Sequence, residues 1–430
     1  MDRAFAVRAL AVYGPAAAAA ALLMLRSGTP RLLAACLTGF AWTVMSLHAL
    51  QMADIQAAWW SFHAQGGMFR GMPIDLLLGW SVLWGVVPIL AFPNARALLV
   101  LACFFVLDLL LMPACRPVVQ LHAHWLRGEA VSLVAVLAPA YLFARTTLSD
   151  THLGFRAAMH VTTFVGVVLL LIPEIVFALR PGIGWAALRA SPGWVVALEL
   201  QAAALLGVIG VSAVQEFAAA GGGTPIPYDP PKELVTSGLY AYVANPMQLS
   251  MSLVLTAWGV VLLNRWIALA GVMAFIYGAG LASWDEGDDM RSRFGGRWQT
   301  YRRNVRAWVP RWTPWHDAEQ PPAILYIAET CGPCSEVRAW FEARHPVALR
   351  IVAAEDHPCR DLDRITYERS GRVDEGVRAV GRALEHLNLA WAFVGACLRL
   401  PGVSHFVQLL LDSTGVGPRP TARRAACQRL

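Results

Sequence analysis

The feature that most constrains this chain is a succession of nearly uncharged stretches, each about as long as one crossing of a lipid bilayer. A helix rises ~1.5 Å per residue, so about 20 apolar residues cross the hydrocarbon layer. Such stretches lie at roughly 7–25, 32–50, 74–93, 97–114, 128–147, 158–180 and 194–217. Two more, 247–263 and 266–283, are separated only by Asn264-Arg265. The pattern predicts an all-α polytopic membrane protein with about nine transmembrane helices.

The composition and charge distribution agree with a membrane protein and limit its partners. Residues of the AVILMFWYC set make up 57% of the chain and charged residues 15%, which lies outside the range of soluble domains. The net charge is +6, but the arginines are scattered among loops, with a concentration in 291–311, and form no basic stripe interleaved with aromatic rings. The expected partner is therefore the lipid bilayer and not nucleic acid. Arginine-rich flanks mark the cytoplasmic side, so an active site and the C-terminal region are expected in the cytoplasm.

The last two apolar stretches are predicted to form a helical hairpin that brings distant polar residues together. Asn245-Pro246 is a good helix start, because Asn caps well and Pro is tolerated at the first helical position. The free N–H groups and positive dipole end of that helix suit a carboxylate. A down-and-back hairpin returns Glu286 to the same membrane face, where its carboxylate suits an ammonium group. A cofactor with both groups fits this pair; the alternative is an ordinary capped helix with a charged interfacial turn.

Residues on both sides of the hairpin form two ordered motifs. The matching residues are Gly238, Tyr240, Tyr242, Asn245, Pro246 and Met247 before the hairpin, and Glu286, Phe294, Gly295, Tyr301, Val305 and Pro310 after it. Their order and spacing resemble the isoprenylcysteine carboxyl methyltransferase family, which also includes phospholipid methyltransferases. The resemblance covers roughly 155–312. The Gly-Gly-Gly-Thr-Pro lead-in at 221–225 is similar to bacterial members, so a bacterial inner membrane is the expected location.

The resemblance implies an enzyme that transfers a methyl group from S-adenosyl-L-methionine to an amphiphilic acceptor such as a prenyl-cysteine or a lipid. It assigns cofactor binding to Gly238, Tyr240, Tyr242, Asn245, Pro246, Met247 and Glu286. The chain departs from the family at Ala244, where Arg is usual, at Gly287, where a second Glu is usual, and at Gln248 and Trp298, where Tyr is usual. Arg306 is then the best remaining cation for orienting an anionic acceptor, and it is the expected catalytic residue of this half.

Residues 1–150 are predicted to form transmembrane helices of unknown role, and 151–315 the methyltransferase-like domain. Asp75, Asp108, Glu174 and Glu199 lie within apolar stretches, where an ionisable group is costly and indicates function unless it reaches water near a span end. His122 and His124 form a pair with no third ligand nearby, so a loop at the membrane surface is favoured and no metal is expected.

After a short polar linker at 316–322, residues 323–430 have the composition of a small α/β domain. Residues 323–328 and 347–352 are predicted to be strands, with Cys331-Gly-Pro-Cys334 and a helix between them. This order of strand, Cys-x-x-Cys, helix and strand is the thioredoxin-like arrangement, in which Cys331 attacks and Cys334 resolves a mixed disulfide. A zinc site, with His357 and Cys359 as further ligands, is the alternative.

The Cys-x-x-Cys segment, together with 376–384, Trp391 and Leu400-Pro401, resembles the thiol–disulfide oxidoreductase family named for its Asp-Cys-Cys motif. The resemblance covers about 323–418 and implies that Cys331 and Cys334 are catalytic, with a thiol or disulfide partner. The first hypothesis is therefore a membrane methyltransferase with a fused redox domain. The alternatives are a membrane-anchored thiol–disulfide oxidoreductase on a degenerate methyltransferase scaffold, and an NADPH-dependent membrane reductase of similar architecture.

Overall fold

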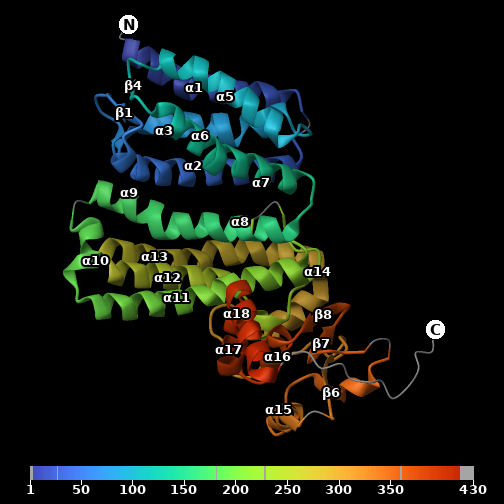
Figure 1. Cartoon of the computed structure of the whole chain (residues 1–430). Helices are drawn as coiled ribbons and strands as arrows, with labels where there is room; N and C mark the ends of the chain where they lie inside the picture. Colours follow the sequence, from blue (N-terminus) through green and yellow to red (C-terminus); the bar gives the residue numbers. More distant parts are fainter. Residues whose placement is uncertain are drawn as a thin grey trace. The chain divides into compact units, whose positions relative to one another are not determined.

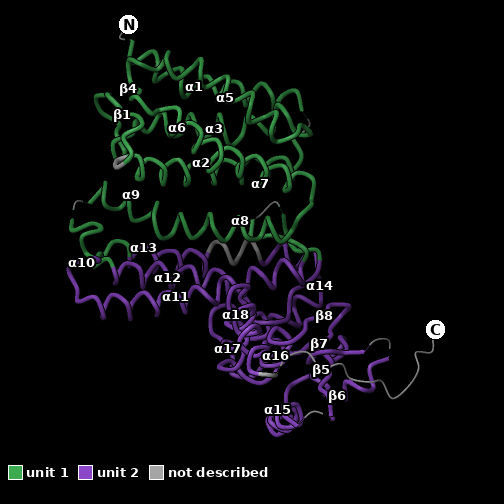
Figure 2. The backbone as a smooth tube through the Cα atoms, in the orientation of Figure 1, with its two compact units in different colours: residues 1–187, 222–232, 262–267 green, residues 188–221, 233–261, 268–430 purple. Residues whose placement is uncertain are grey.

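The computed structural model describes residues 3–26, 28–180, 182–226, 229–330, 332–358 and 361–416, with the side chains of 55–56, 281–286 and 415–416 outside the description. The chain divides into two compact units (Figure 2). The N-terminal unit consists of Met1–Ala187, Gly222–Lys232 and Leu262–Ile267, and the C-terminal unit of Leu188–Gly221, Glu233–Val261 and Ala268–Leu430. The described residues are mostly helical, with a small sheet late in the chain (Figure 1).

The N-terminal unit is a helical bundle. Its helices are α1 (Arg3–Met24), α2 (Pro30–Ala57), α3 (Ile74–Gly85), α4 (Val87–Ala91), α5 (Ala97–Ala114), α6 (Trp125–Ser132), α7 (Ala138–Leu148), α8 (Leu153–Gly166) and α9 (Ile172–Leu179). Short antiparallel ladders join β1 (Trp60–Phe62) to β4 (Val119–Leu121) and β2 (Met68–Phe69) to β3 (Met72–Pro73). Glycine permits the closest helix crossings: a Cβ at Gly79 of α3 would lie 1.7 Å from the carbonyl oxygen of Ala11 in α1.

Seven of the predicted apolar stretches are confirmed as helices long and apolar enough to cross a membrane. They are Arg3–Met24, Pro30–Asp54, Ile74–Ala91, Ala97–Ala114, Trp125–Leu148, Leu153–Leu179 and Gly193–Gly221. Several of these spans contain a π-helical turn, at Leu133–Leu137, Val167–Leu171 and Phe217–Gly221. These seven stretches could be predicted because hydropathy is a local property of each stretch.

The two helices of the predicted hairpin lie within two residues of the predicted bounds, although each is shorter than a full membrane span. Helix α12 spans Pro246–Val261, and α13 (Arg265–Tyr277) extends by a π-helical turn at Gly278–Ala282. Leu263 has a positive φ of 49°, and the Asn264 side chain accepts hydrogen bonds from the backbone N–H groups of Trp266 and Ile267. This turn ends one helix and caps the next. Of the about nine predicted transmembrane helices, the described residues therefore contain seven that are long enough by themselves, or eight if the bent pair Leu389–Arg399 and Pro401–Thr414 is one span, and the hairpin adds two shorter apolar helices.

In the C-terminal unit, α11 (Gly193–Glu216) packs along α12, where Ser250 Oγ donates to the carbonyl of Leu206 at 2.7 Å. Helix α14 (Ser283–Asn304) follows α13 and bends at Gly295, whose φ of 52° and ψ of −124° are non-helical. This positive φ is a conformation that glycine adopts without steric cost. The short helix α10 (Ala187–Ala190) precedes α11.

The last part of the C-terminal unit is a four-stranded sheet with helices. Its elements are β5 (Ala323–Ile327), α15 (Gly332–Glu342), β6 (Leu349–Ala353), β7 (Thr366–Arg369), β8 (Arg372–Glu375), α16 (Val377–Leu384), α17 (Leu389–Arg399) and α18 (Pro401–Leu411). The strand order is β6-β5-β7-β8, with β5 and β6 parallel and the other pairs antiparallel. The predicted order of strand, helix and strand over 323–353 is therefore present. A core of buried residues that includes Leu325, Phe341 and Leu384 joins the sheet to α15 and α16.

Candidate functional site

The two motifs that flank the hairpin meet in the C-terminal unit. The backbone N–H of Ala244 donates to the carbonyl of Arg306 at 2.9 Å, and that of Asn245 donates to the carbonyl of Ala307 at 3.1 Å. Further contacts continue this pairing: Arg311 N to Tyr242 O at 3.0 Å, Trp315 N to Ala241 O at 2.9 Å, and Tyr301 Oη to Tyr240 O at 2.8 Å. The segment after α14 thus lies against the segment before α12, so the two motifs lie together.

The start of α12 has the predicted form. The N–H of Leu249 donates to the carbonyl of Asn245 at 3.1 Å, so Asn245 precedes the first turn and Pro246 is the first helical residue. Met247 packs beside Val235 and Tyr240 in a small buried cluster. The Arg306 side chain is exposed. The Glu286 side chain lies outside the described residues, although its backbone belongs to α14.

Two polar atoms are buried close to this helix start without a hydrogen-bond partner among the described residues. They are Oε1 of Gln248, from the first turn of α12, and Nε1 of Trp308, from the segment after α14. Both side chains abut Gly278: a Cβ there would lie 2.9 Å from Trp308 Cη2 and 3.4 Å from Gln248 Oε1. A buried unpaired donor or acceptor costs about 1–3 kcal/mol, so this pair is suited to hydrogen bonds with a polar ligand.

Tyr242, a predicted cofactor-binding residue, directs its side chain elsewhere. Its ring is fully buried beside Ala392 and Ala396 of α17, and its hydroxyl donates to the carbonyl of Glu385 at 2.8 Å. Burial raises the pKa of Tyr242, so the hydroxyl stays protonated as a donor. Gly238 has a φ of +61°, and a Cβ there would approach Glu216 Cγ at 3.1 Å. These two residues fix the segment between α11 and α12.

The side of this segment nearest α11 contains a buried ionic cluster that sequence reasoning missed. Glu216, at the end of α11, is 1% exposed and accepts hydrogen bonds from Ser237, Arg382 and Arg399. Arg399 also pairs with Glu385 at 2.7 Å. The only signal in the sequence was a carboxylate at the end of an apolar stretch, because the arginines lie far along the chain.

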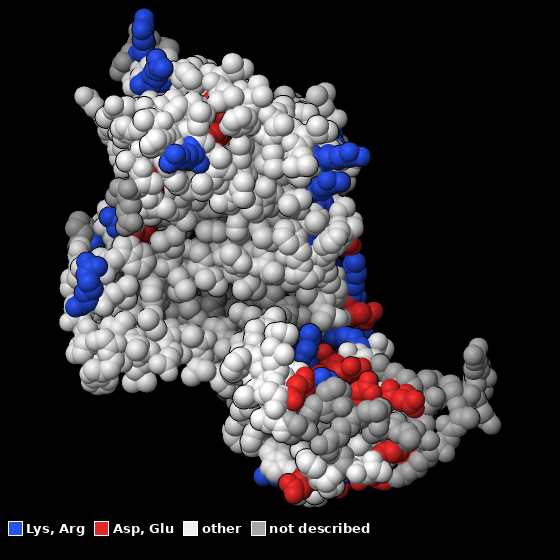
Figure 3. All heavy atoms as spheres, viewed as in Figure 1, with Lys and Arg blue, Asp and Glu red and all other residues white. Residues whose placement is uncertain are grey.

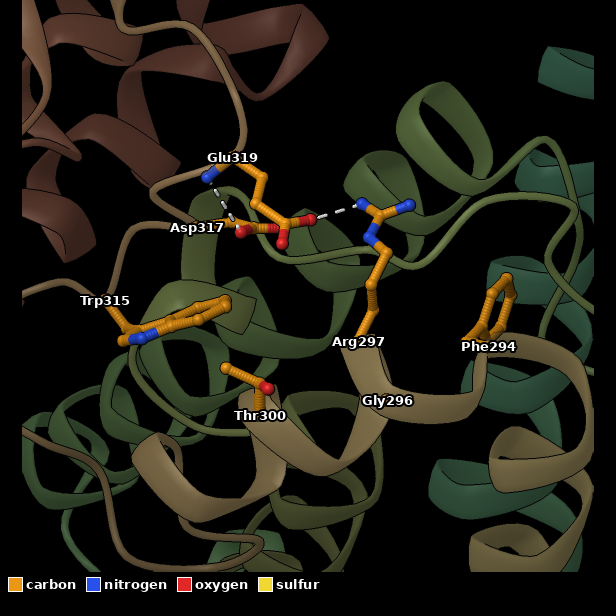
Figure 4. Close-up of a pocket in the computed structure, with 7 residues that line it drawn as sticks. All are labelled: Phe294, Gly296, Arg297, Thr300, Trp315, Asp317 and Glu319. Atoms are coloured by element: carbon orange, nitrogen blue, oxygen red, sulfur yellow. Dashed lines mark hydrogen bonds and ion pairs between the residues drawn. The ribbon is translucent and has the colours of Figure 1, made fainter.

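A hollow of about 450 Å³ lies at the second motif (Figure 4). It is lined by Phe294, Gly296, Arg297, Thr300, Trp315, Asp317 and Glu319. Arg297 Nη2 lies 3.6 Å from Asp317 Oδ2, and the backbone N–H of Glu319 donates to Asp317 Oδ1 at 3.2 Å. Its lining of carboxylates, one guanidinium and two aromatic rings suits a small polar or cationic ligand.

The Cys-x-x-Cys segment is described in part. Cys331 lies outside the described residues, and Cys334 is half-buried in the first turn of α15. The buried carboxylate of Glu355 accepts hydrogen bonds from the backbone N–H groups of Glu329 and Thr330 and from the Thr330 hydroxyl. Burial alone would raise the pKa of Glu355, but these hydrogen bonds outweigh it and lower the pKa to about 2. An ionised carboxylate therefore anchors the turn before Cys331.

The N-terminal unit binds the glycine-rich lead-in through ion pairs. Asp229, 1% exposed, pairs with the equally buried Arg156 of α8 and with Arg31 of α2 at 3.2 Å. It also accepts from Thr224 Oγ1 at 2.7 Å. Buried ion pairs of Asp229, and its hydrogen bond with Thr224 of the lead-in, thus hold this part of the chain in place.

Three of the four ionisable residues of the predicted spans are paired or buried. Asp75 pairs with Arg8 of α1, and Glu174 is fully buried and accepts from Arg70 and from the indole of Trp185. Asp108 is buried, whereas Glu199 is partly exposed.

Metal ligation receives no support from the described residues. The His122 ring contacts Ser61 Oγ at 3.1 Å, and within the described ranges no group of three or more His, Cys, Asp or Glu side chains is placed to hold a metal ion. This statement does not include Cys331 and Cys359, which lie outside the description.

Comparison of the chain with protein-family models, with curated proteins and with solved structures finds no match.

Proposed function

We propose that this chain is an integral-membrane methyltransferase that uses S-adenosyl-L-methionine and acts on an amphiphilic acceptor. The observation that carries the proposal is the backbone pairing of Ala244 and Asn245 with Arg306 and Ala307. It brings the two motifs together at the start of α12, although the helical hairpin separates them in sequence. Seven helices have the length and composition of membrane spans. A protein embedded in the bilayer in this way can receive an amphiphilic acceptor from the surrounding lipid.

The chain's own residues have distinct roles in this proposal. The first N–H groups of α12 provide donors and a positive dipole end for the carboxylate of the methyl donor. Gln248 and Trp308 supply one acceptor and one donor for its polar groups. The exposed guanidinium of Arg306 orients an anionic acceptor.

S-adenosyl-L-methionine, when bound at the start of α12, would supply an electrophilic methyl group to a lone pair of the acceptor. An ionised carboxylate acceptor needs no base. The protein then contributes mainly alignment and exclusion of water.

The test uses the purified full chain in detergent and two ligands, S-adenosylhomocysteine and NADPH, each titrated by calorimetry. Binding of the first ligand alone is expected. Arg306→Ala should then abolish methyl transfer to a prenyl-cysteine or lipid acceptor without changing S-adenosylhomocysteine affinity. Arg303→Ala, which alters another exposed arginine of the same segment, is the matched control. Binding of NADPH alone would contradict the proposal and favour the reductase alternative.

A second candidate, thiol–disulfide exchange by Cys331 and Cys334, is supported by the turn that Glu355 anchors. Cys334 lies in the first turn of α15, directly after the segment whose backbone Glu355 holds. A helix N-terminus lowers the pKa of a nearby thiol and so activates it. Alkylation of the full chain across pH, compared with Cys331→Ser and Cys334→Ser, should show one fast thiol that only Cys331→Ser removes. Two slow thiols with pKa near about 8.5 would contradict this candidate.

A further inference from the structure

Helix α18 has its polar stripe turned toward its own domain. Ser404 is 7% exposed, and Gln408 accepts from the backbone N–H of Val377 at 2.9 Å while donating to Asp412 at 2.9 Å. Asp412 in turn pairs with Arg364 at 2.6 Å. Ser404, Gln408 and Asp412 recur every four positions and therefore share one face of the helix. The polar face of α18 thus holds it against the sheet domain, by which we mean the four-stranded sheet with α15, α16 and α17.

The opposite face of α18 is apolar and exposed. Val403, Phe406, Leu409 and Leu410 have 38%, 66%, 55% and 52% of their surface exposed. The helix contains no Asp, Glu, Lys or Arg from Pro401 to Leu411. A helix on the surface of a soluble domain has the reverse arrangement, with the apolar stripe inside. A contiguous exposed apolar face of this kind marks an interaction surface.

The position of α18 within the C-terminal unit indicates which partner covers this face. Helix α17, which precedes it, packs against α11, and Arg399 at its end bonds to Ser212 at 3.1 Å and to Glu216 at 3.2 Å. Ser212 and Glu216 form the last turn of α11, which belongs to one of the seven apolar spans. The chain then bends by 85° into α18. Helix α18 therefore begins level with the end of a helix long enough to cross the membrane.

The surface chemistry is consistent with this placement. Figure 3 shows an uncharged surface over α17 and α18, whereas acidic and basic side chains gather over β7 and β8. With 11 residues, α18 is about 16 Å long, roughly half of what one crossing requires. It is thus suited to lie in the interface plane with its apolar face among the acyl chains.

We infer that α18 is an interfacial membrane helix, inserted through Val403, Phe406, Leu409 and Leu410 into the leaflet at which α11 ends. The sheet domain is then held to the bilayer at two points, through α17 on α11 and through α18 in the lipid. This attachment does not depend on the proposed methyltransferase or thiol chemistry.

The test measures lipid contact at single positions of the full chain. Phe406→Cys and Leu410→Cys are made in a background whose native cysteines are replaced by Ser, labelled with a nitrobenzoxadiazole fluorophore, and reconstituted into phosphatidylcholine–phosphatidylglycerol vesicles. Glu336→Cys, an exposed position on α15, is the matched control. Lipids with a nitroxide on the acyl chain should quench the labels at 406 and 410 several-fold more than the label at 336, while iodide should quench mainly the control.

Two results would overturn the inference. Equal iodide quenching at all three positions would place α18 in water. A label at 406 that is shielded from both quenchers, together with an oxidant-induced disulfide between two unlabelled Phe406→Cys chains, would show that a second copy covers the face. A thermal unfolding curve matching that of the unlabelled background protein verifies that each variant is folded.

Phe406→Asp in the native chain gives an independent readout: it should raise hydrogen exchange in α18 in vesicles without altering the unfolding temperature in detergent.

Discussion

The buried carboxylate of Glu216 is the residue whose removal should most disturb the C-terminal unit. Its oxygens contact the guanidinium groups of Arg382 and Arg399, whose side chains are only 9% and 5% exposed, and that of the 38% exposed Arg372 at 3.6 Å. Arg382 and Arg399 also pair with Glu385, at 3.6 and 2.7 Å, so these two arginines and the two glutamates form one buried cluster of four charges. Burial of the cluster means that water cannot replace a lost partner.

Glu216→Gln keeps the side-chain volume but removes one negative charge, leaving the two buried cations with Glu385 and with Asp374, which lies 3.1 Å from Arg382. Removing one partner of a buried pair costs about 3–5 kcal/mol. Since each 1.4 kcal/mol is tenfold, the open population of α16 and α17 should rise roughly a hundredfold to a few thousandfold. Hydrogen exchange of Val377–Leu384 and Leu389–Arg399, followed by mass spectrometry on the full chain in detergent, measures this directly.

The matched control is Glu342→Gln, which breaks the pair with Arg338 at 2.9 Å where the carboxylate is 52% exposed. An exposed pair contributes about 0–1 kcal/mol, so this variant should exchange almost as the parent does. Equal exchange in the two variants would refute the assignment of Glu216 as the anchor of the C-terminal helices.

Three further predictions follow from buried contacts. Tyr242→Phe leaves the Glu385 carbonyl without its donor and should lower stability by about 1–2 kcal/mol, seen as a lower unfolding temperature in detergent; an unchanged temperature would contradict it. Asp229→Asn leaves the 1% exposed Arg156 with only Asp150 as a carboxylate partner and should increase proteolysis of residues 222–232, whereas the exposed Lys232→Gln should not. Glu355, with a folded pKa of about 2 and an unfolded value near 4.3, stabilises the fold above pH ~4.3 and loses that contribution as the pH falls toward 2. The difference in unfolding free energy between the parent and Glu355→Gln should therefore shrink as the pH falls from about 4.3 to 2. A difference that does not change with pH would contradict the stabilising role of the ionised Glu355 carboxylate.

The seven long helices could be predicted because each depends on the local hydropathy of its own residues. The hairpin helices and the place of their turn were predictable for the same reason, to within two residues. The way the turn is made was not, because a run of apolar residues shows neither the positive φ of Leu263 nor the cap by the Asn264 side chain. The order of strand, helix and strand after residue 323 was predictable from the short apolar runs on either side of the glycine- and proline-containing turn.

The meeting of the two motifs was predictable in outline, but the direction of individual side chains was not. A hairpin returns the chain to its starting face whatever its exact length, and residues near 245 and 306 are found paired. The predicted meeting of Asn245 with Glu286 stays a prediction, because the Glu286 side chain lies outside the described residues. Tyr242 instead bonds to a residue 143 positions later, and Glu216 to one 166 positions later. Such long-range partners leave no periodic signal, and a tyrosine in a motif looks the same whether it faces a ligand or a neighbouring helix.

These long-range contacts change how the two halves of the chain should be assayed. Residues 323–430 expressed alone would expose Ala392 and Ala396, which pack beside Tyr242, and would leave Arg382 and Arg399 without Glu216. The buried guanidinium groups would then have to be hydrated or the helices displaced, at a cost comparable with the stability of a small domain. Slow alkylation of Cys331 or Cys334 in such a fragment would report on unfolding as much as on thiol chemistry. The full chain is the meaningful unit for both activities, because α17 packs against α11 and residues 239–242, which precede the start of α12.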